Sequence, residues 1–185
     1  MASAMELSIL DQTTLSPWYI RNILCFQFED CSKRPQAVQQ LKNGLQATFA
    51  HWPFLAGFVK PDHSHDYKRT GRHIVRYDRV AKDVERSKRF SADYQTENSF
   101  PWTYQNMLSD GMPASELKEN TIVSLDWQQS IDGPLPITHV KVTFIKGGLF
   151  LAIYIHHMVC DGVGATVVCK QFADNVRNRV TRSKE

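Results

Sequence analysis

One segment in the last third of the chain constrains the fold more than any other. Val140, Val142 and Phe144 alternate with polar residues, Lys146-Gly147-Gly148 follows, and residues 149–156 continue as an apolar stretch. An apolar period of two is typical of a β-strand, and a glycine-containing turn lets the next strand run back beside the first. Residues 138–156 therefore predict a β-hairpin.

A helix is predicted directly after this hairpin. Gly162 and Gly164 separate it from a set of small and apolar residues at helical spacing, namely Ala165, Val168, Cys169, Phe172, Ala173 and Val176. A buried strand that leads through glycines into a helix with one apolar face is an α/β arrangement. The pattern indicates that the fold is α/β, with a two-layer mixed β-sheet and flanking helices.

The earlier part of the chain repeats this alternation of strand and helix. Residues 19–28 are rich in aromatic and β-branched side chains and predict a strand. Residues 35–49 have apolar positions at helical spacing and a proline in the first turn, which predicts an amphipathic helix. Residues 54–59 and 72–78 predict a further pair of strands, and residues 79–120 predict loops with one short helix.

Length and composition set limits on the kind of protein. A chain of 185 residues buries enough surface to fold as one domain, residues 1–185, without a disulfide or metal staple. A net charge of +3 is too small to predict nucleic-acid binding. The N-terminus lacks the basic and apolar regions of a secretory signal, and no apolar stretch is long enough to cross a membrane. We therefore expect a cytoplasmic protein with reduced thiols at its cysteines, Cys25, Cys31, Cys160 and Cys169.

The side chains best suited to catalysis lie between the hairpin and the helix. The sequence there reads Ile155-His156-His157-Met158-Val159-Cys160-Asp161-Gly162. Strand-to-helix junctions in α/β proteins present side chains from a rigid scaffold at an accessible loop. A histidine with a carboxylate four residues later has the parts of a general base and an orienting partner. The alternative is that one histidine belongs to the core and Asp161 caps the helix.

Several segments carry a resemblance to a known family. The string HHMVCDG resembles the HHxxxDG signature of the chloramphenicol-acetyltransferase-like superfamily, which includes CoA-dependent acyltransferases of the BAHD and fungal trichothecene O-acetyltransferase type. Leu7-Ser8-Ile9-Leu10-Asp11, residues 41–59 and Gly133-Pro134-Leu135-Pro136 with Lys146-Gly147-Gly148 resemble further segments of that family in the same order. A single HxxxD pattern is weak evidence, whereas this colinear set covers most of the chain.

The resemblance implies a reaction and a role for each residue of the motif. His157 would be the general base that takes a proton from a hydroxyl or amine of a small acceptor, such as a fungal secondary metabolite. That acceptor would attack acyl-CoA, acetyl-CoA above all, as co-substrate, with no bound cofactor and no metal. Asp161 would be structural and paired with an arginine, and His156 would pack in the core. Gly162 would allow a tight turn, because glycine tolerates a positive φ.

The length departs from the family pattern. Family members are about twice as long, with two similar halves and the histidine in a tunnel between them, so this chain resembles the N-terminal half. The missing half would carry the DFGWG motif, the oxyanion-binding group and most of the CoA surface. The chain is therefore interpreted as an acyltransferase half that works with a second copy or a partner chain, or as a non-catalytic half-enzyme. A condensation-domain-like protein is a third interpretation, which the LSILD opening argues against.

Three other features suggest chemistry less strongly. Asp62-His63-Ser64-His65-Asp66 offers metal ligands, but no further cluster accompanies it and a solvated turn is the preferred interpretation. Residues 68–89 hold nine Lys/Arg that could attract CoA phosphates, but a mixed solvated surface is preferred. Cys160 suggests a nucleophile beside the histidines, yet no oxyanion site accompanies it, so packing is preferred.

Overall fold

The computed structural model describes residues 2–13, 19–63, 71–79, 84–117 and 133–182. They form two four-stranded sheets, in the orders β1-β4-β3-β6 and β2-β8-β7-β5. The strands are β1 (Ala2–Glu6), β2 (Tyr19–Gln27), β3 (Phe58–Pro61), β4 (His73–Asp78), β5 (Phe90–Tyr94), β6 (Leu135–Pro136), β7 (Thr138–Ile145) and β8 (Gly148–His156). The helices are α1 (Ile9–Gln12), α2 (Arg34–His51), α4 (Val84–Ser87), α5 (Tyr104–Ser109) and α6 (Gly162–Arg182), with 3-10 turns η1 (Cys31–Lys33), η2 (Pro53–Ala56) and η3 (Ala114–Glu116). The fold is α/β, as expected, with two sheets instead of one.

The predicted hairpin lies at the centre of the larger sheet. β7 and β8 pair antiparallel along their whole length, and Gly147 turns the chain between them with a φ of 77°. Every residue of both strands is buried. One face is covered by the helices, and the other carries an aromatic cluster that includes Phe100 and Phe150. The polar residues that alternate along β7 are therefore buried as well: His139, Lys141 and Thr143.

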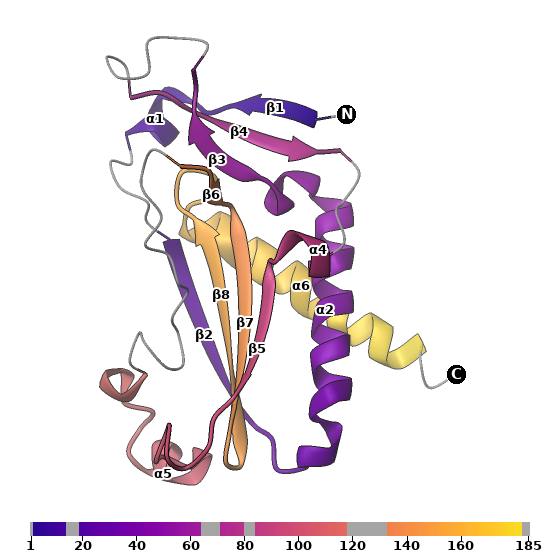
Figure 1. The fold of residues 1–185 in the computed structure, drawn as a ribbon, viewed down its shortest axis with the longest axis vertical. Helices are drawn as coiled ribbons and strands as arrows, with labels where there is room; N and C mark the ends of the chain where they lie inside the picture. Colours follow the sequence, from indigo (N-terminus) through magenta and orange to yellow (C-terminus); the bar gives the residue numbers. More distant parts are fainter. Residues whose placement is uncertain (1, 14–18, 64–70, 80–83, 118–132, 183–185) are drawn as a thin grey trace.

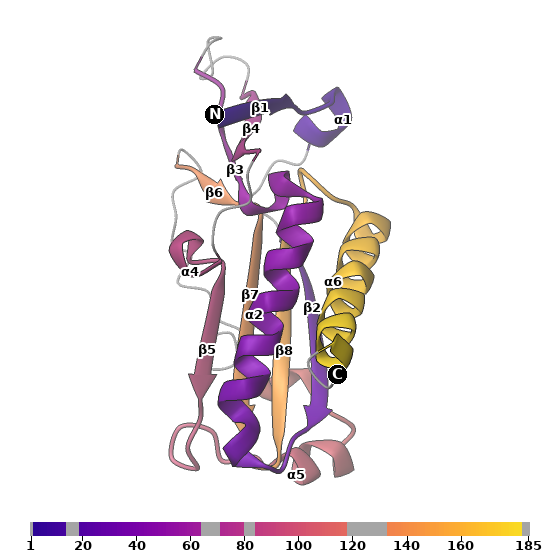
Figure 2. The same cartoon turned by 90° about the vertical axis from the view of Figure 1, so that its right-hand side faces the viewer.

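The two longest helices lie side by side on one face of this sheet, as Figure 2 shows. α2 begins with Pro35 in its first turn and buries Leu45 and Phe49. α6 buries Ala165, Val168 and Phe172 in the same core, whereas Ala173, which the spacing placed on the apolar face, is exposed. Neither these helices nor any other in the described part of the chain is long and apolar enough to cross a membrane.

Two segments differ from the sequence prediction. Residues 54–59 are predicted as one strand, but the turn η2 occupies their first part and β3 begins at Phe58. Pro53 favours the turn, because its ring fixes φ near the value of a 3-10 helix. β3 then pairs with β4, so the predicted strand pair exists over a shorter length. β5 lies in the region predicted as loops, and it pairs parallel with β7.

Candidate functional site at the junction of the two sheets

Strand β8 ends close to β6, where the two sheets join (Figure 1), and the histidine pair of the motif lies at this end of β8. The chain passes from β6 in the smaller sheet to β7 in the larger sheet at Ile137. The N–H of Ile137 donates to the carbonyl of Gly57 at 3.1 Å, and the N–H of His156 donates to the carbonyl of Ile137 at 2.8 Å. The hydroxyl of Tyr19 donates to the carbonyl of Pro136 at 2.7 Å. These bonds fix the end of β8, where the motif begins, to both sheets.

His156 points into the protein. Its side chain is fully buried, and its ring meets that of Tyr19 in a T-shaped contact with 4.9 Å between centroids. Its Nδ1 accepts a hydrogen bond from the backbone N–H of Met158 at 3.2 Å. Burial above all, and then the nearby His73 and His157, lower the pKa of His156 to about 4. The ring is therefore neutral at neutral pH and able to accept this bond.

His157 is exposed, on the turn that follows β8. The turn is closed by the N–H of Val159, which donates to the carbonyl of His156 at 3.0 Å, and by the bond from Met158 to the His156 ring. Adjacent residues at the end of this strand thus have opposite environments. Only His157 of the pair presents an imidazole that a substrate hydroxyl could approach.

Asp161 lies at the start of α6. Its Oδ1 accepts a hydrogen bond from the N–H of Gly164 at 2.7 Å, and its carbonyl accepts one from the N–H of Ala165 at 2.8 Å. This is the arrangement of a helix N-cap, in which a side chain satisfies a backbone N–H that the helix leaves unpaired. Among the residues that the structure describes, no arginine forms an ion pair with Asp161. The carboxylate of Asp161 caps the N-terminus of α6 instead.

The two glycines that follow the motif's aspartate, Gly162 and Gly164, have different surroundings. Gly162 has no positive φ, and a Cβ at this position would meet nothing within 4 Å, so the expected tight turn through Gly162 is wrong. Gly164 is the constrained position, because a Cβ there would lie 2.5 Å from Sγ of Cys160 and 3.3 Å from Oδ1 of Asp161. The sequence shows only that a glycine occurs at this position. It does not indicate that the side chains of Cys160 and Asp161 would lie close to it.

The buried side chain of Arg89 binds backbone carbonyls next to the junction of the two sheets. Arg89 is 4 % exposed, and its Nη2 donates to the carbonyls of Gly57 at 2.9 Å and Ala56 at 3.3 Å. Its guanidinium lies over the ring of Phe58, 4.1 Å from the centroid. No carboxylate pairs with it within the described ranges, and burial lowers its pKa to about 10. The expectation of a solvated basic surface for residues 68–89 is therefore wrong for Arg89.

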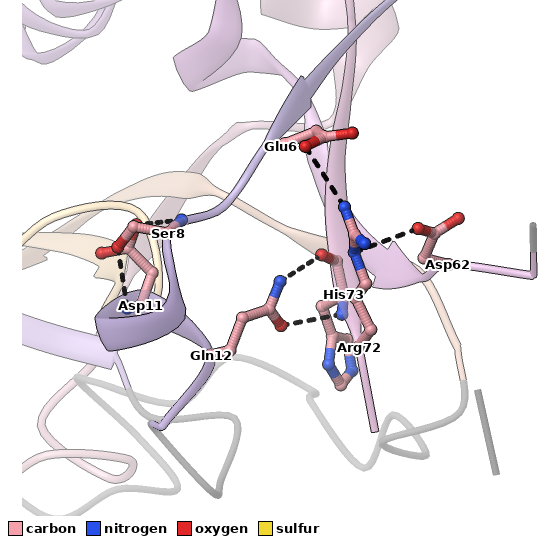
Figure 3. Close-up of polar contacts among 7 residues, drawn as sticks. All are labelled: Glu6, Ser8, Asp11, Gln12, Asp62, Arg72 and His73. Atoms are coloured by element: carbon pink, nitrogen blue, oxygen red, sulfur yellow. Dashed lines mark hydrogen bonds and ion pairs between the residues drawn. The ribbon is translucent and has the colours of Figure 1, made fainter. Parts of the chain in front are cut away.

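Side chains at the end of β1 and in α1 contact the residues at the start of β4, the neighbouring strand of the smaller sheet (Figure 3). The side-chain amide of Gln12 donates to the carbonyl of His73 at 2.8 Å and accepts the N–H of His73 at 2.9 Å. Arg72 contacts the carboxylates of Glu6 at 3.2 Å and Asp62 at 3.4 Å. Ser8 and Asp11 form a local capping box at the start of α1. The segment that resembles the family opening thus has a structural role here.

The remaining sequence candidates are placed only in part. Asp62 is buried and paired with Arg72, so a solvated turn is wrong for this residue; Ser64, His65 and Asp66 lie outside the described residues. Cys160 is half-buried, and burial raises the pKa of its thiol to about 11, which opposes a thiolate nucleophile. No group of metal-binding side chains occurs among the residues described.

A comparison of the sequence with models of known protein families identifies one match. Residues 18–175 match the model of the trichothecene 3-O-acetyltransferase-like N-terminal domain. The chain belongs to this family. The match takes in the sheet junction, both histidines of the motif and most of α6. The family expected from the sequence is confirmed.

Two fungal proteins are similar to nearly all of this chain at low identity. Acyltransferase easC of Emericella nidulans is 27 % identical over 181 residues, which are 97 % of this chain and 36 % of that protein. Trichothecene 3-O-acetyltransferase TRI101 of Fusarium sporotrichioides is 24 % identical over 187 residues, 98 % of this chain and 39 % of that protein. The chain thus spans less than two fifths of the length of these relatives.

Solved structures confirm the fold. The crystal structure of Fusarium graminearum TRI101 complexed with ethyl coenzyme A is 25 % identical, with a TM-score of 0.81 over 96 % of this chain and 40 % of that one. The same enzyme complexed with coenzyme A and T-2 mycotoxin gives a TM-score of 0.81 at 24 % identity, over 95 % of this chain and 40 % of that one. Fusarium graminearum TRI101, which shares this fold, is thus a protein that has been crystallised with coenzyme A and with ethyl coenzyme A.

Proposed function

We propose that this chain supplies the general base, His157, of an acyltransferase. The enzyme would move an acyl group, in the first instance acetyl, from acyl-CoA to a hydroxyl or amine of a small secondary metabolite. The observation that carries the proposal is the opposite placement of the two histidines, with His156 buried and neutral and His157 exposed on a fixed turn. Support comes from relatives that are acyltransferases and acetyltransferases, and from the coenzyme A derivatives in their crystals.

In the proposed reaction both substrates lie beside His157 at the same time. The imidazole takes the proton of the acceptor hydroxyl while the hydroxyl oxygen forms a bond to the thioester carbonyl carbon. The tetrahedral intermediate then collapses, the C–S bond breaks, and the imidazolium returns the proton to the thiolate of CoA. No acyl-enzyme is needed. General-base catalysis of this kind contributes about 10²- to 10⁴-fold to the rate.

The neighbouring residues have positioning roles in this proposal. His156 holds the turn through the bond from Met158, and Asp161 orders the first turn of α6 through Gly164. Asp161 is not assigned to a catalytic triad, because its carboxylate is engaged by the helix. His157 therefore acts as a base without a carboxylate partner from its own motif.

The other parts of the active site are proposed to come from residues that correspond to the unmatched part of these relatives. The chain covers 36 % of the acyltransferase easC and 40 % of the crystallised TRI101, so most of each relative has no counterpart in these residues. The groups that hold the oxyanion and the CoA nucleotide would lie in residues that correspond to that remainder. A second copy of this chain is the alternative source, because the halves of the superfamily fold are expected to be alike.

The experiment joins the chain to the part of Fusarium graminearum TRI101 that it does not match. Thiol release from acetyl-CoA is measured with a panel of hydroxylated and amine acceptors. We expect acceptor-dependent release in the joined protein, none in the isolated chain, and a loss of at least about 100-fold in His157→Ala. His51→Ala is the matched control, because His51 is also exposed but lies at the end of α2. Turnover that survives His157→Ala would contradict the proposal.

A further inference from the structure

The backbone and the side chain of Arg89 bind different sheets. Its backbone carbonyl accepts the N–H of Val140 on β7, in the larger sheet, at 2.9 Å. Its guanidinium extends to the start of β3, in the smaller sheet, where Nη2 donates to the carbonyls of Ala56 and Gly57. The same guanidinium lies over the ring of Phe58, the first residue of β3. Arg89 therefore connects the two sheets directly.

The carbonyl of Gly57 links this contact to the motif. Its oxygen accepts two hydrogen bonds, one from Nη2 of Arg89 at 2.9 Å and one from the N–H of Ile137 at 3.1 Å. The carbonyl of Ile137 accepts the N–H of His156 at 2.8 Å. A series of three hydrogen bonds thus connects the guanidinium to the backbone of His156, the residue that directly precedes His157.

The charge of Arg89 strengthens the first bond of this series. The guanidinium is buried, no carboxylate pairs with it within the described ranges, and its Nε has no hydrogen-bond partner there. A charged donor binds a carbonyl about twice as strongly as a neutral donor. Because a buried cation is costly to leave unsatisfied, the guanidinium and the carbonyls of Ala56 and Gly57 hold one another in place.

We propose that Arg89 is a positioning residue for the reaction assigned to His157, so the inference rests on the proposed function. The guanidinium holds the Gly57 carbonyl, and this carbonyl holds, through Ile137, the end of β8. The turn after β8 begins at His156 and carries His157. A shift of this strand end would therefore move the imidazole away from the substrates, and misplacement by about 1 Å can lower a rate about 100-fold.

Kinetics of thiol release test the proposal in the chain joined to the unmatched part of Fusarium graminearum TRI101. Arg89→Met replaces the guanidinium with an unbranched neutral side chain. We expect kcat to fall at least about 10-fold. The KM values for acetyl-CoA and for the acceptor should stay within about twofold, because the imidazole is misplaced for the chemical step while the substrates still bind.

Met107→Ala is the matched control for a general loss of stability. Met107 is also fully buried, but it lies on α5, at the end of the larger sheet that is farther from β6 (Figure 1). This variant should be less stable than the wild type and keep its kcat within about twofold. Urea denaturation shows whether each variant is folded under the assay conditions.

A spectroscopic measurement in the isolated chain does not depend on turnover. The imidazole resonances of His157 should shift in Arg89→Met and stay in place in Met107→Ala. Should Arg89→Met fail to fold, Arg89→Lys takes its place in both measurements. It keeps the charge but cannot donate to two carbonyls at once, so it should lower kcat in the same direction.

Each other outcome overturns the positioning role. A kcat in the Arg89 variant equal to that of Met107→Ala, or His157 resonances that do not move, would reject it. A raised KM with unchanged kcat would assign Arg89 to substrate binding instead. If His157→Ala abolishes thiol release while the Arg89 variant keeps its kcat, the proposed function stands and this inference alone fails. The resonances decide the question in a joined protein that shows no turnover.

Discussion

The backbone N–H of Met158 donates to Nδ1 of His156 at 3.2 Å. Because Nδ1 is the acceptor, the neutral ring carries its hydrogen on Nε2, which is buried without a hydrogen-bond partner. A proton added to Nδ1 would remove the acceptor and leave a charged ring in the core. The turn that carries His157 therefore depends on a neutral His156.

Replacement of His156 is expected to destabilise the fold and to loosen this turn. His156→Ala removes a fully buried ring and leaves the N–H of Met158 without its acceptor. The free energy of unfolding should fall by about 2–4 kcal/mol, measured by urea denaturation. The imidazole resonances of His157 should shift as well. His51→Ala, at an exposed position, should change the free energy by less than about 0.5 kcal/mol; an equal loss there would refute the prediction.

Stability should decrease in mild acid. Burial lowers the pKa of His156 and of His139 to about 4, and for His139 the nearby Arg89 adds to the effect. In the unfolded chain a histidine titrates near pH 6.5, so the unfolded state takes up protons first as the pH falls. The stability is complete above pH 6.5 and declines towards pH 4, by roughly 3 kcal/mol for each group. Urea denaturation at pH 7.5, 5.5 and 4.5 measures this slope.

A variant separates the two contributions to the acid slope. His139→Gln removes one titrating group while the amide can still bond to Ser91, whose Oγ lies 3.0 Å from Nε2 of His139. Its dependence on pH between 6.5 and 4 should be about half as steep as in the wild type. A slope that stays the same in His139→Gln would show that other groups cause the acid sensitivity.

The fold could be predicted where one pattern is local and strong. Apolar residues at regular spacing within short segments predict the hairpin of β7 and β8 and the two long helices. Each of these elements forms where the sequence indicates. β5 could not be found in this way, because it pairs in parallel with β7 about fifty residues later and its own five residues are weakly apolar. The burial of Arg89 could not be predicted from the sequence either, because it depends on backbone carbonyls of a turn that is distant in the sequence.

The site could be predicted at the level of residue types and not of geometry. The motif identifies a candidate base, His157, and the helix that follows identifies Asp161 as a cap in the alternative interpretation. Nothing in the spacing indicates that His156 would accept the N–H of Met158, because this requires the ring to turn into the core. The roles of the two glycines also depend on where Sγ of Cys160 lies, which only the folded chain determines.

Arg89 is expected to tolerate no conservative replacement. Arg89→Lys keeps the charge but loses the planar group that lies over Phe58 and reaches two carbonyls at once. The free energy of unfolding should fall by about 2 kcal/mol, since buried carbonyls lose charged donors. Arg177→Lys, on the exposed side of α6, is the matched control and should be neutral. Thermal denaturation of both variants measures the difference, and equal midpoints would argue against a support role for Arg89.

Alanine substitutions at Gly162 and Gly164 are expected to change the stability of the protein in opposite directions. Gly164→Ala places a Cβ 2.5 Å from Sγ of Cys160, so that side chain must rotate; because the helix preference of alanine offsets part of this cost, the protein should be destabilised by about 1 kcal/mol at most. Gly162→Ala enters open space at the start of α6 and should be neutral or raise stability by up to about 1 kcal/mol, because alanine favours the helix.

A double substitution tests the cause of this difference. Cys160→Ala removes the sulfur that the new Cβ would meet, so Gly164→Ala should cost clearly less in that background than in the wild type. Urea denaturation of the four proteins of this cycle gives the coupling between the two positions. A coupling near zero would mean that Gly164 is required by the contact with Asp161, 3.3 Å from the same Cβ, and the N-cap bond would then be the feature that excludes a side chain.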